Sequence, residues 1–410
     1  MAETSACDVA IIGGGPSGLA AAMALREAGV AQVVVLEREK QAGGIPRHCG
    51  HPPFGLREFG RILSGPRYAA RLVETAERAG IDIRRQHTVV ALHPGGSLDL
   101  ATPDGTATLQ ARRVILATGV RETPRSARFI GGDRPQGVIN TGALQAFTYL
   151  EKQRPFARPV IIGSELVAFS ALLTCRKAGM QPVAMVEAND RVTAWSPYAL
   201  APRLFGVPLL LETELIEICG SGQVGRVRLR RDNTEVLLDC DGVILTGRFV
   251  PAAELVRSSH LALDVGSGGP VVDQHGRCSD AAYFATGNLL RPVETAGWSW
   301  REGRRVGAVV AQDLAGDLPA PDRVLSIERG AHVKLTVPQR LALPRLGTGL
   351  GDFIQLRASD KAGGMISISC GDRVIWRGWR NTLPERRILI PLADLALPEG
   401  ADSIRVSIED

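Results

Sequence analysis

Short apolar runs separated by amphipathic stretches occupy the first three quarters of the chain. The runs of strand length are 9–12, 33–36, 114–116, 160–162 and 283–285. The stretches 19–28 and 68–79 are predicted as helices that end at Gly29 and Gly80, because glycine can take the left-handed conformation that stops a helix. Strands that alternate with helices in this way predict an α/β fold.

Three further segments are read from the same pattern. Residues 38–55 are dense in glycine and proline, which predicts a long loop without regular elements. Residues 306–314 are predicted to be helical, and 315–322 are predicted to form a linker.

The pattern changes after residue 323. Apolar residues alternate with polar ones at 354/356, 366/368/370 and 404/406/408, which is the period of strands with one buried face. Gly371 and Asp372 form a plausible two-residue hairpin turn. We therefore expect a small C-terminal antiparallel β domain of about five or six strands.

The first apolar run leads into a glycine-rich turn with the spacing G-x-G-x-x-G. Gly13 permits the tight turn, Gly15 lets a pyrophosphate approach the backbone, and Gly18 lets helix and strand pack closely. Glu37 ends the next strand at the distance expected for an acid that binds ribose hydroxyls. A purely structural glycine turn is the alternative, but the strand, the helix and the acid together predict a dinucleotide site.

A second copy of this plan follows at 159–187, with one departure. Gly163 opens the turn and Glu187 ends the second strand, but Glu165 stands where the middle glycine belongs. A carboxylate about 4 Å from a phosphate charge is repelled by roughly 4 kcal/mol at an effective dielectric constant of 20. We therefore expect this second fold to use NAD(P)H poorly, and to serve structure or another ligand instead.

Composition and charge exclude several classes of function. The net charge of +5 comes from arginines spread along the chain rather than gathered in a patch, so no nucleic-acid partner is expected. No signal peptide is recognised and no apolar run is long enough for a membrane span. The seven cysteines are scattered without a C-x-x-C pair, which argues against a metal site and a redox disulfide and favours a cytoplasmic location.

Two further motifs reveal a family resemblance. The apolar strand 114–116 runs into Ala117-Thr118-Gly119, and the strand 283–284 runs into Ala285-Thr286-Gly287. Together with the N-terminal fingerprint, these motifs resemble the flavoproteins with two dinucleotide-binding domains, the glutathione-reductase-like superfamily. The resemblance implies two Rossmann-like domains: a discontinuous FAD-binding domain (1–119 and 252–318) and an NAD(P)-binding-like domain (120–251), followed here by the C-terminal β domain (323–410).

The resemblance also implies the residues that bind FAD. They are Gly13, Gly15, Pro16, Ser17, Gly18, Glu37, Arg38, Gly44, Ile45, Val89, Ala117, Thr118, Gly119, Gly287, Asn288, Gly297 and Trp298. Asn288 replaces the family's usual acid, so it keeps hydrogen bonds but supplies no charge. The helix that follows is implied to face the flavin pyrimidine with its N-terminus. The second fold (Gly163, Glu165, Glu187) is left open to NAD(P)H, ATP or no ligand.

One branch of the superfamily is closest in its local motifs. Gly43-Gly44-Ile45 and Ser64-Gly65-Pro66 resemble the nucleotide-binding subunits of multi-subunit amine and amino-acid dehydrogenases. That branch includes such subunits of opine oxidase, of hydrogen cyanide synthase and of dye-linked proline dehydrogenases, and similar chains accompany glycerol-3-phosphate dehydrogenase-like proteins. The resemblance implies a partner flavoprotein dehydrogenase subunit, together with a small-molecule electron acceptor or carrier.

The loop after Gly44 carries the candidate catalytic residues. His48 or His51 could exchange a proton beside the flavin, because imidazole titrates near neutral pH. Cys49 could act as a thiolate but lacks a resolving cysteine. Three functions stay open: an electron-transfer subunit of a dehydrogenase complex, a stand-alone NAD(P)H-dependent reductase, and a non-catalytic scaffold that holds FAD or ATP.

Overall fold

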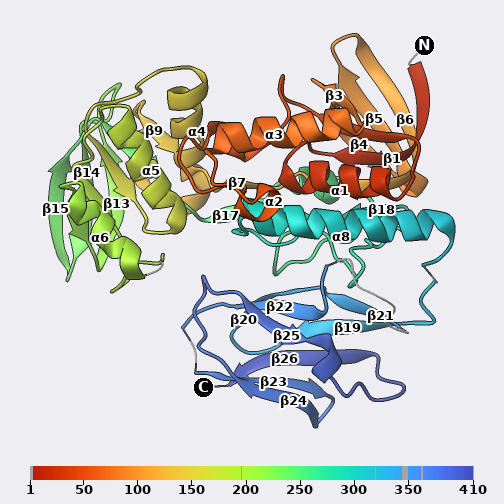
Figure 1. The fold of residues 1–410 in the computed structure, drawn as a ribbon. Coiled ribbons are helices and arrows are strands. Elements are labelled where there is room, and N and C mark those ends of the chain that lie inside the picture. Colours follow the sequence, from red (N-terminus) through yellow and green to blue (C-terminus); the bar gives the residue numbers. More distant parts are fainter. Residues whose placement is uncertain (1–2, 195, 319, 344–349, 362, 410) are drawn as a thin grey trace.

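The computed structural model describes residues 3–194, 196–318, 320–343, 350–361 and 363–409, so Pro319 of the expected linker lies outside the described residues. Figure 1 shows three units: an N-terminal α/β unit, a middle α/β unit beside it, and a β unit beneath the N-terminal unit. The predicted fold class is confirmed, since Rossmann-like sheets precede C-terminal sheets that are mostly antiparallel.

The N-terminal unit is built on one seven-stranded sheet with the order β3-β2-β1-β6-β5-β4, and with β18 also paired to β6. Its strands are β1 (Glu3–Ile12), β2 (Val33–Glu37), β3 (Asp82–Arg85), β4 (Thr88–His93), β5 (Ser97–Thr102), β6 (Gly105–Leu116) and β18 (Tyr283–Ala285). β1 runs parallel to β2 and β6, and β18 is also parallel to β6. Their carboxyl ends therefore meet at one edge, where ligands of such sheets bind.

Helices α1 (Pro16–Glu27), α3 (Gly65–Arg78) and α8 (Ala296–Ala315) pack on this sheet. α1 and α8 lie side by side in Figure 1 and approach closely because α8 presents glycine to α1. A Cβ on Gly307 would lie 2.5 Å from the backbone oxygen of Ala21. α8 begins at Ala296, ten residues before the predicted start, because Thr295 caps it by accepting a hydrogen bond from Trp298 N.

The middle unit contains two sheets. The parallel sheet has the order β12-β11-β10-β16-β9, and an antiparallel sheet with β8 at its edge has the order β15-β14-β13-β8. The strands are β8 (Gly131–Gly132), β9 (Val138–Asn140), β10 (Pro159–Ile162), β11 (Ala184–Val186), β12 (Leu209–Leu210), β13 (Thr213–Cys219), β14 (Arg226–Arg231), β15 (Thr234–Asp239) and β16 (Gly242–Leu245). The helices are α4 (Thr141–Gln145), α5 (Leu166–Lys177) and α6 (Leu200–Leu204).

A two-stranded antiparallel pair joins the first two units. β7 (Val120–Glu122) directly follows the first A-T-G motif, and β17 (Phe249–Pro251) carries the chain back to the N-terminal unit, where α7 (Glu254–Arg257) follows. The chain thus leaves and re-enters that unit through adjacent strands.

The C-terminal unit contains more strands than predicted. Its described residues form a five-stranded sheet (β21-β19-β26-β23-β24) and a three-stranded sheet (β20-β22-β25) around one apolar core. The strands are β19 (Arg323–Arg329), β20 (Val333–Val337), β21 (Arg340–Leu343), β22 (Phe353–Ala358), β23 (Met365–Cys370), β24 (Arg373–Trp379), β25 (Ile388–Pro391) and β26 (Ser403–Glu409). The prediction of five or six strands was wrong, and β19 pairs with β26 in parallel. Cys370 pairs with Arg373, which confirms the two-residue turn at Gly371-Asp372.

The expected loop at 38–55 also contains a regular element. Residues Ile45–His48 form a short 3-10 helix, and α2 (Leu56–Phe59) follows. The prediction that nothing regular forms there was wrong, because Pro46 occupies the first turn of this helix, where it needs no amide hydrogen.

Candidate functional site

The first glycine turn has the shape that a dinucleotide pyrophosphate requires. Gly13 has φ +113°, and a Cβ there would lie 2.5 Å from the backbone oxygen of Ala117. A Cβ on Gly18 would overlap the backbone oxygen of Gly13. At Gly15 a Cβ would meet only Gly44 Cα, at 3.8 Å. The turn is therefore closed toward the sheet and open above Gly15, where α1 begins without a side-chain cap.

Glu37 is placed to hold a ribose. Its side chain is buried, Oε2 accepts a hydrogen bond from Gly14 N at 3.1 Å, and Oε1 accepts one from Glu39 N at 2.9 Å. An ionised carboxylate has about four acceptor positions, so these two bonds leave capacity for ribose hydroxyls. Arg38 is exposed beside Glu39. Val89 lies buried in β4, and a hydrogen bond from His87 N to Glu37 O keeps the start of β4 close to Glu37.

The two A-T-G motifs meet the glycine turn at the same edge of the sheet. Ser17 Oγ donates to Thr286 Oγ1 at 3.0 Å, and a Cβ on Gly287 would lie 2.9 Å from Ser17 Cβ. Thr118 Oγ1 donates to the backbone oxygen of Ala252 at 2.8 Å, and Gly119 has φ +74°. The structure thus brings the sequence-predicted residues of both motifs together around α1.

Gly44 and Ile45 border the open side of the first glycine turn. A Cβ on Gly44 would lie 2.9 Å from Gly15 Cα, and the Ile45 side chain is 55% exposed. The bare turn, the acceptor capacity of Glu37 and the close packing of Gly44 fit FAD. When bound, FAD would supply hydride and single-electron transfer, and the protein would supply binding and orientation.

Trp298 packs against the C-terminal unit. Its ring lies under the guanidinium of Arg387, with 3.7 Å between the guanidinium carbon and the ring centroid, and its centroid is 5.9 Å from that of Phe353. Both neighbours belong to the C-terminal unit. The indole therefore packs at the contact between the two units, and its contact with the flavin stays a prediction. Gly297 packs against α2, where a Cβ would lie 3.2 Å from Arg57 Cδ.

The second A-T-G motif is held by buried charged side chains that sequence reasoning missed. Glu302 in α8 accepts a hydrogen bond from Gly287 N at 2.7 Å and forms an ion pair with Arg291, whose side chain is 1% exposed. Burial lowers the pKa of Arg291 to about 10, which still leaves it charged at neutral pH. No motif marks buried pairs of this kind. The one signal in the sequence is that Glu302 precedes the apolar Val306 by four residues, which puts both on one face of a helix.

The candidate catalytic residues are turned toward the middle unit. His48 is buried, and Nδ1 has no hydrogen-bond partner among the described residues. Burial lowers the pKa of His48, and the charge of Arg47 lowers it further, so the imidazole is neutral at pH 7. His51 Nε2 is 2.5 Å from Ser170 Oγ on α5, and Gln145 Nε2 donates to the same hydroxyl at 2.6 Å.

Cys49 is poorly placed to act as a thiolate. Its Sγ lies 3.4 Å from Gln145 Oε1 and is buried. Burial raises the pKa of this thiol to about 12, and the charge of the nearby Glu122 contributes to the increase. Glu122, which sequence reasoning missed, accepts a hydrogen bond from Gly142 N at 2.7 Å, and burial raises its pKa. The three loop residues thus form a contact between units rather than an exposed reactive cluster.

We expect Cys49 to resist alkylation in the folded protein at pH 8. A thiol with a pKa of about 12 is about 0.01% ionised at that pH, and the thiolate is the reactive form. Iodoacetamide labelling followed by peptide mass analysis measures this, with Cys370, which is partly exposed, as the internal comparison. Labelling of Cys49 at the rate of Cys370 would contradict the burial.

The second glycine turn is filled by its own glutamate. Thr246 Oγ1 donates to Glu165 Oε2 at 2.8 Å. A Cβ on Gly163 would lie 2.5 Å from the same Oε2, and a Cβ on Gly247 would overlap Oε1. Glu165 therefore folds back over the turn between Gly163 and Thr246, and its side chain replaces the bare backbone that a pyrophosphate approaches at a middle glycine.

Glu187 is engaged by the protein itself. Oε1 accepts hydrogen bonds from Asn189 N at 2.9 Å and from Asn189 Nδ2 at 2.6 Å. Oε2 accepts from Ser164 Oγ and from Thr193 Oγ1, the latter at 3.3 Å. Four donors fill the acceptor positions of the carboxylate, in contrast to Glu37. The residues present in this state do not fit NAD(P)H.

The charge of Glu165 predicts a pH-dependent stability. Burial raises the pKa of Glu165, so its contribution to stability is complete below its unfolded-state pKa and is lost as pH rises through the folded-state pKa. We expect Glu165→Gln, which retains an oxygen that can accept from Thr246, to match the wild type at pH 4 and to exceed its stability at pH 8.5. Urea unfolding at both pH values measures this, and equal stability at pH 8.5 would contradict it.

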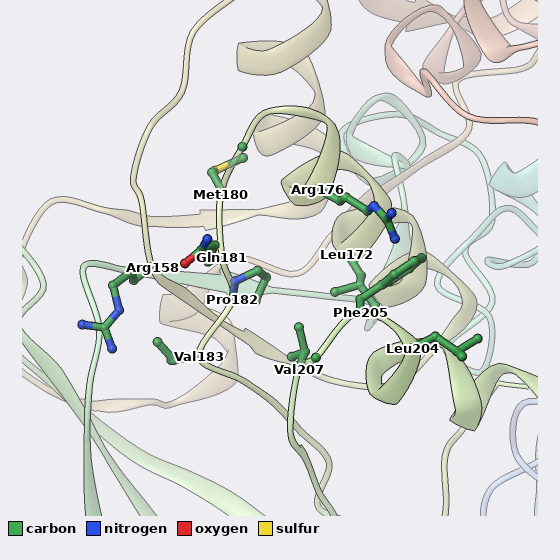
Figure 2. A pocket seen from close by; sticks show the side chains of 12 residues that line it. Arg158, Leu172, Arg176, Met180, Gln181, Pro182, Val183, Leu204, Phe205 and Val207 are labelled. Carbon is green, nitrogen blue, oxygen red and sulfur yellow. The ribbon is translucent and has the colours of Figure 1, made fainter.

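A cavity in the middle unit lies away from both turns. The cavity has a volume of 630 Å³, and Arg158, Arg176 and Phe205 are among its lining residues (Figure 2). It is bounded by Pro182 and Val207, which precede β11 and β12, whereas the nucleotide edge lies beyond the opposite ends of these strands. We therefore do not assign it to a dinucleotide.

Two features are absent from the described residues. No helix there is both long and apolar enough to cross a membrane. Nor does that part of the chain contain a group of three or more His, Cys, Asp or Glu side chains able to hold a metal ion.

Comparison with curated proteins finds distant relatives. The chain is 26% identical over 338 residues to the ferredoxin–NAD(+) reductase subunit of the benzene 1,2-dioxygenase system of Pseudomonas putida, in an alignment that covers 78% of this chain and 77% of that protein. It is 25% identical over 313 residues to an opine oxidase subunit from Rhizobium meliloti, over 68% of this chain and 58% of that one. Several other relatives are matched over about two fifths of their length.

Solved structures share the fold. Thioredoxin reductase from T. acidophilum matches with a TM-score of 0.61 and 23% identity, over 76% of this chain and 98% of that one. L-proline dehydrogenase from P. horikoshii matches with a TM-score of 0.59 and 19% identity, over 77% of this chain and 57% of that one. At these identities the likeness shows the fold alone.

The model of one protein family matches residues 7–303, which include both glycine turns and both A-T-G motifs, and leaves the C-terminal unit outside. The names of three relatives include a nicotinamide coenzyme, which is NAD(+) in one and NADPH or NADP in the other two. The chain belongs to the pyridine nucleotide-disulphide oxidoreductase family.

Proposed function

We propose that this oxidoreductase is the FAD-binding electron-transfer subunit of a hetero-oligomeric dehydrogenase that acts on an amine, an amino acid or a polyol phosphate. In this proposal 1–119 and 252–318 form the FAD-binding domain, 120–251 the NAD(P)-binding-like domain, and 323–410 the C-terminal β domain. A separate flavoprotein subunit oxidises the substrate, and this chain passes the electrons to a small-molecule acceptor or carrier.

The observation that carries the proposal is the contrast between the two glycine turns. The first is open above Gly15 and has an acid with spare acceptor capacity. The second is filled by Glu165, and its acid Glu187 is already bonded to four donors. A chain that can hold FAD but admits NAD(P)H poorly needs another source of electrons, and a partner subunit is one.

The absence of a redox disulfide points the same way. All seven cysteines are free, and five of them are buried. Burial raises the pKa of Cys175 to about 12, as it does for Cys49. Thiol–disulfide exchange, which starts from a thiolate, is therefore not supported by these cysteines.

The relatives include subunits of larger enzymes. The matched opine oxidase and sarcosine oxidase chains of Rhizobium meliloti are both subunits by name, and this chain is 25% identical to the first and 26% identical to the second. The chain spans only 28% of the sarcosine oxidase subunit, so substrate and partner come to this chain only as proposals.

A second candidate function is a self-contained NAD(P)H-dependent reductase. It is favoured by the match to the ferredoxin–NAD(+) reductase subunit over 77% of that protein's length. It requires Glu165 to swing out of the turn and Glu187 to release a donor.

Two measurements decide between the candidates. Affinity purification from the native host with mass identification of bound proteins is expected to recover a flavoprotein dehydrogenase subunit. Anaerobic NADH or NADPH at 1 mM is expected to leave the flavin of the purified chain oxidised for minutes. Rapid bleaching by either coenzyme would overturn the proposal in favour of the reductase, and flavin that the assembled complex cannot reduce would indicate a scaffold.

A further inference from the structure

Glu294 is a buried carboxylate held entirely by the C-terminal unit. Its side chain is 4% exposed. It accepts hydrogen bonds from Gln355 Nε2 at 2.7 Å and from Arg357 Nη2 at 3.0 Å, and it forms an ion pair with Arg387. These three partners lie on or next to β22 and β25, whereas Glu294 lies between the second A-T-G motif and α8. The contact therefore spans the two units.

The backbone of Glu294 is hydrogen-bonded to Asn288, which directly follows the second A-T-G motif. Asn288 Nδ2 donates to Glu294 O at 3.1 Å, and Glu294 N donates to Asn288 Oδ1 at 2.9 Å. Both polar atoms of the Asn288 amide are thus used to hold the 288–294 turn. Whatever fixes Glu294 also fixes the position of Asn288 and of the preceding Gly287.

The start of α8 is covered from the same side. The Arg387 guanidinium lies over the Trp298 ring, and Phe353 lies beside it. Arg357 also donates from Nη1 to Glu385 O at 2.7 Å, which ties β22 to the loop that precedes β25. The C-terminal unit therefore clamps the segment on both sides of Thr295.

The cluster carries an excess of positive charge. Three guanidinium groups, of Arg291, Arg357 and Arg387, face two carboxylates, Glu294 and Glu302. Nε and Nη1 of Arg291 and Nε of Arg357 are buried without a hydrogen-bond partner among the described residues. Positive charge is therefore in excess next to the turn where this chain has Asn288 in place of an acid.

We propose that the C-terminal β unit is a positioning element of the FAD site, and that it acts through Gln355, Arg357 and Arg387 on Glu294 and through Glu294 on Asn288. The unit is then a part of the cofactor site and not only a cover for the enzyme. This inference rests on the FAD site proposed above, but it does not depend on the source of the electrons.

The test compares FAD affinity in full-length variants freed of cofactor. Glu294→Gln is expected to raise the FAD dissociation constant about 10- to 100-fold, the loss typical of a buried hydrogen bond to a charged group. In the cofactor-free state, hydrogen exchange of residues 286–298 is expected to be faster in Glu294→Gln than in the wild type. Arg405→Gln is the matched control, because it removes an ion pair with Glu328 on the five-stranded sheet of the same unit, which includes neither β22 nor β25.

A double-mutant cycle tests the route. Asn288→Ala is expected to weaken FAD binding, and Arg387→Gln is expected to weaken it in the wild type but to add little in the Asn288→Ala background. Arg387 is one-third exposed, so this variant keeps the test valid should Glu294→Gln fail to fold. Wild-type FAD affinity in Glu294→Gln and Arg387→Gln, with lowered thermal stability, would overturn the proposal and reduce the contact to a structural one. Failure of the wild type to bind FAD would instead refute the proposed function.

Discussion

Gly18→Ala is expected to abolish FAD retention. The new methyl group would overlap the backbone oxygen of Gly13, so α1 and β1 must separate at the point where the pyrophosphate is held. Overpacking of this kind costs about 1–3 kcal/mol in stability, and each amide donor that is displaced from the charged pyrophosphate costs about 10- to 100-fold in FAD affinity. The absorbance of the purified protein near 450 nm, together with an FAD titration, measures both effects.

Gly225→Ala provides the control for this experiment. A Cβ at Gly225 would have only the backbone oxygen of Cys219 within 4 Å, at 3.9 Å, and no positive φ is required there. It is expected to bind FAD as the wild type does. A yellow Gly18→Ala protein with an unchanged FAD dissociation constant would show that the first glycine turn does not hold the cofactor.

The glycine turn could be predicted from sequence because its geometry depends on the backbone. Gly13 must take a positive φ and Gly18 must have no side chain, so spacing alone marks them. Acids at the ends of buried strands can also be predicted, because the strand fixes their distance from the glycine turn. This is why the positions of Glu37 and Glu187 were predicted, whereas their different hydrogen-bond saturation was not.

Contacts between units could not be predicted in this way, because no sequence motif specifies them. The start of α8 at Ala296 was missed because glycine, serine and tryptophan near it mimic a loop, and only the cap at Thr295 reveals the helix. Trp298 was placed at the flavin by the family resemblance, which could not predict that its ring also packs on Arg387 from a segment about 90 residues away. Such pairings depend on the fold of the C-terminal unit, which no motif specified.

The loop 45–51 shows a further reason why some site residues were not placed correctly from the sequence. Its histidines and cysteine have the chemistry of a reactive site, but chemistry depends on exposure and neighbours as well as on residue type. Cys49 faces Gln145, and His51 faces Ser170, both on helices of the middle unit. Their surroundings were set by how that unit docks, which the sequence of the loop alone does not contain.

Glu165→Gly is expected to raise the NADH reactivity of the second fold above that of the wild type. The substitution removes the carboxylate that lies over the turn and restores the glycine that the fingerprint requires at this position. Removal of a repulsion of at most roughly 4 kcal/mol per charge pair corresponds to a gain of up to about 1000-fold in NADH affinity. Because burial raises the pKa of Glu165 and Glu187 stays saturated, we expect a gain nearer the lower end, about 10-fold.

Anaerobic stopped-flow reduction of the flavin at varied NADH concentration measures this gain, and Glu165→Gln separates charge from volume. In the wild type, any NADH-dependent reduction should increase as pH falls through the raised pKa of Glu165, because protonation removes the repulsion. Glu165→Gln should lose that pH dependence while its side chain still fills the turn. Unchanged reduction rates in both variants would show that Glu165 is not what excludes the coenzyme, and the contrast between the two turns would then no longer support electron delivery by a partner subunit.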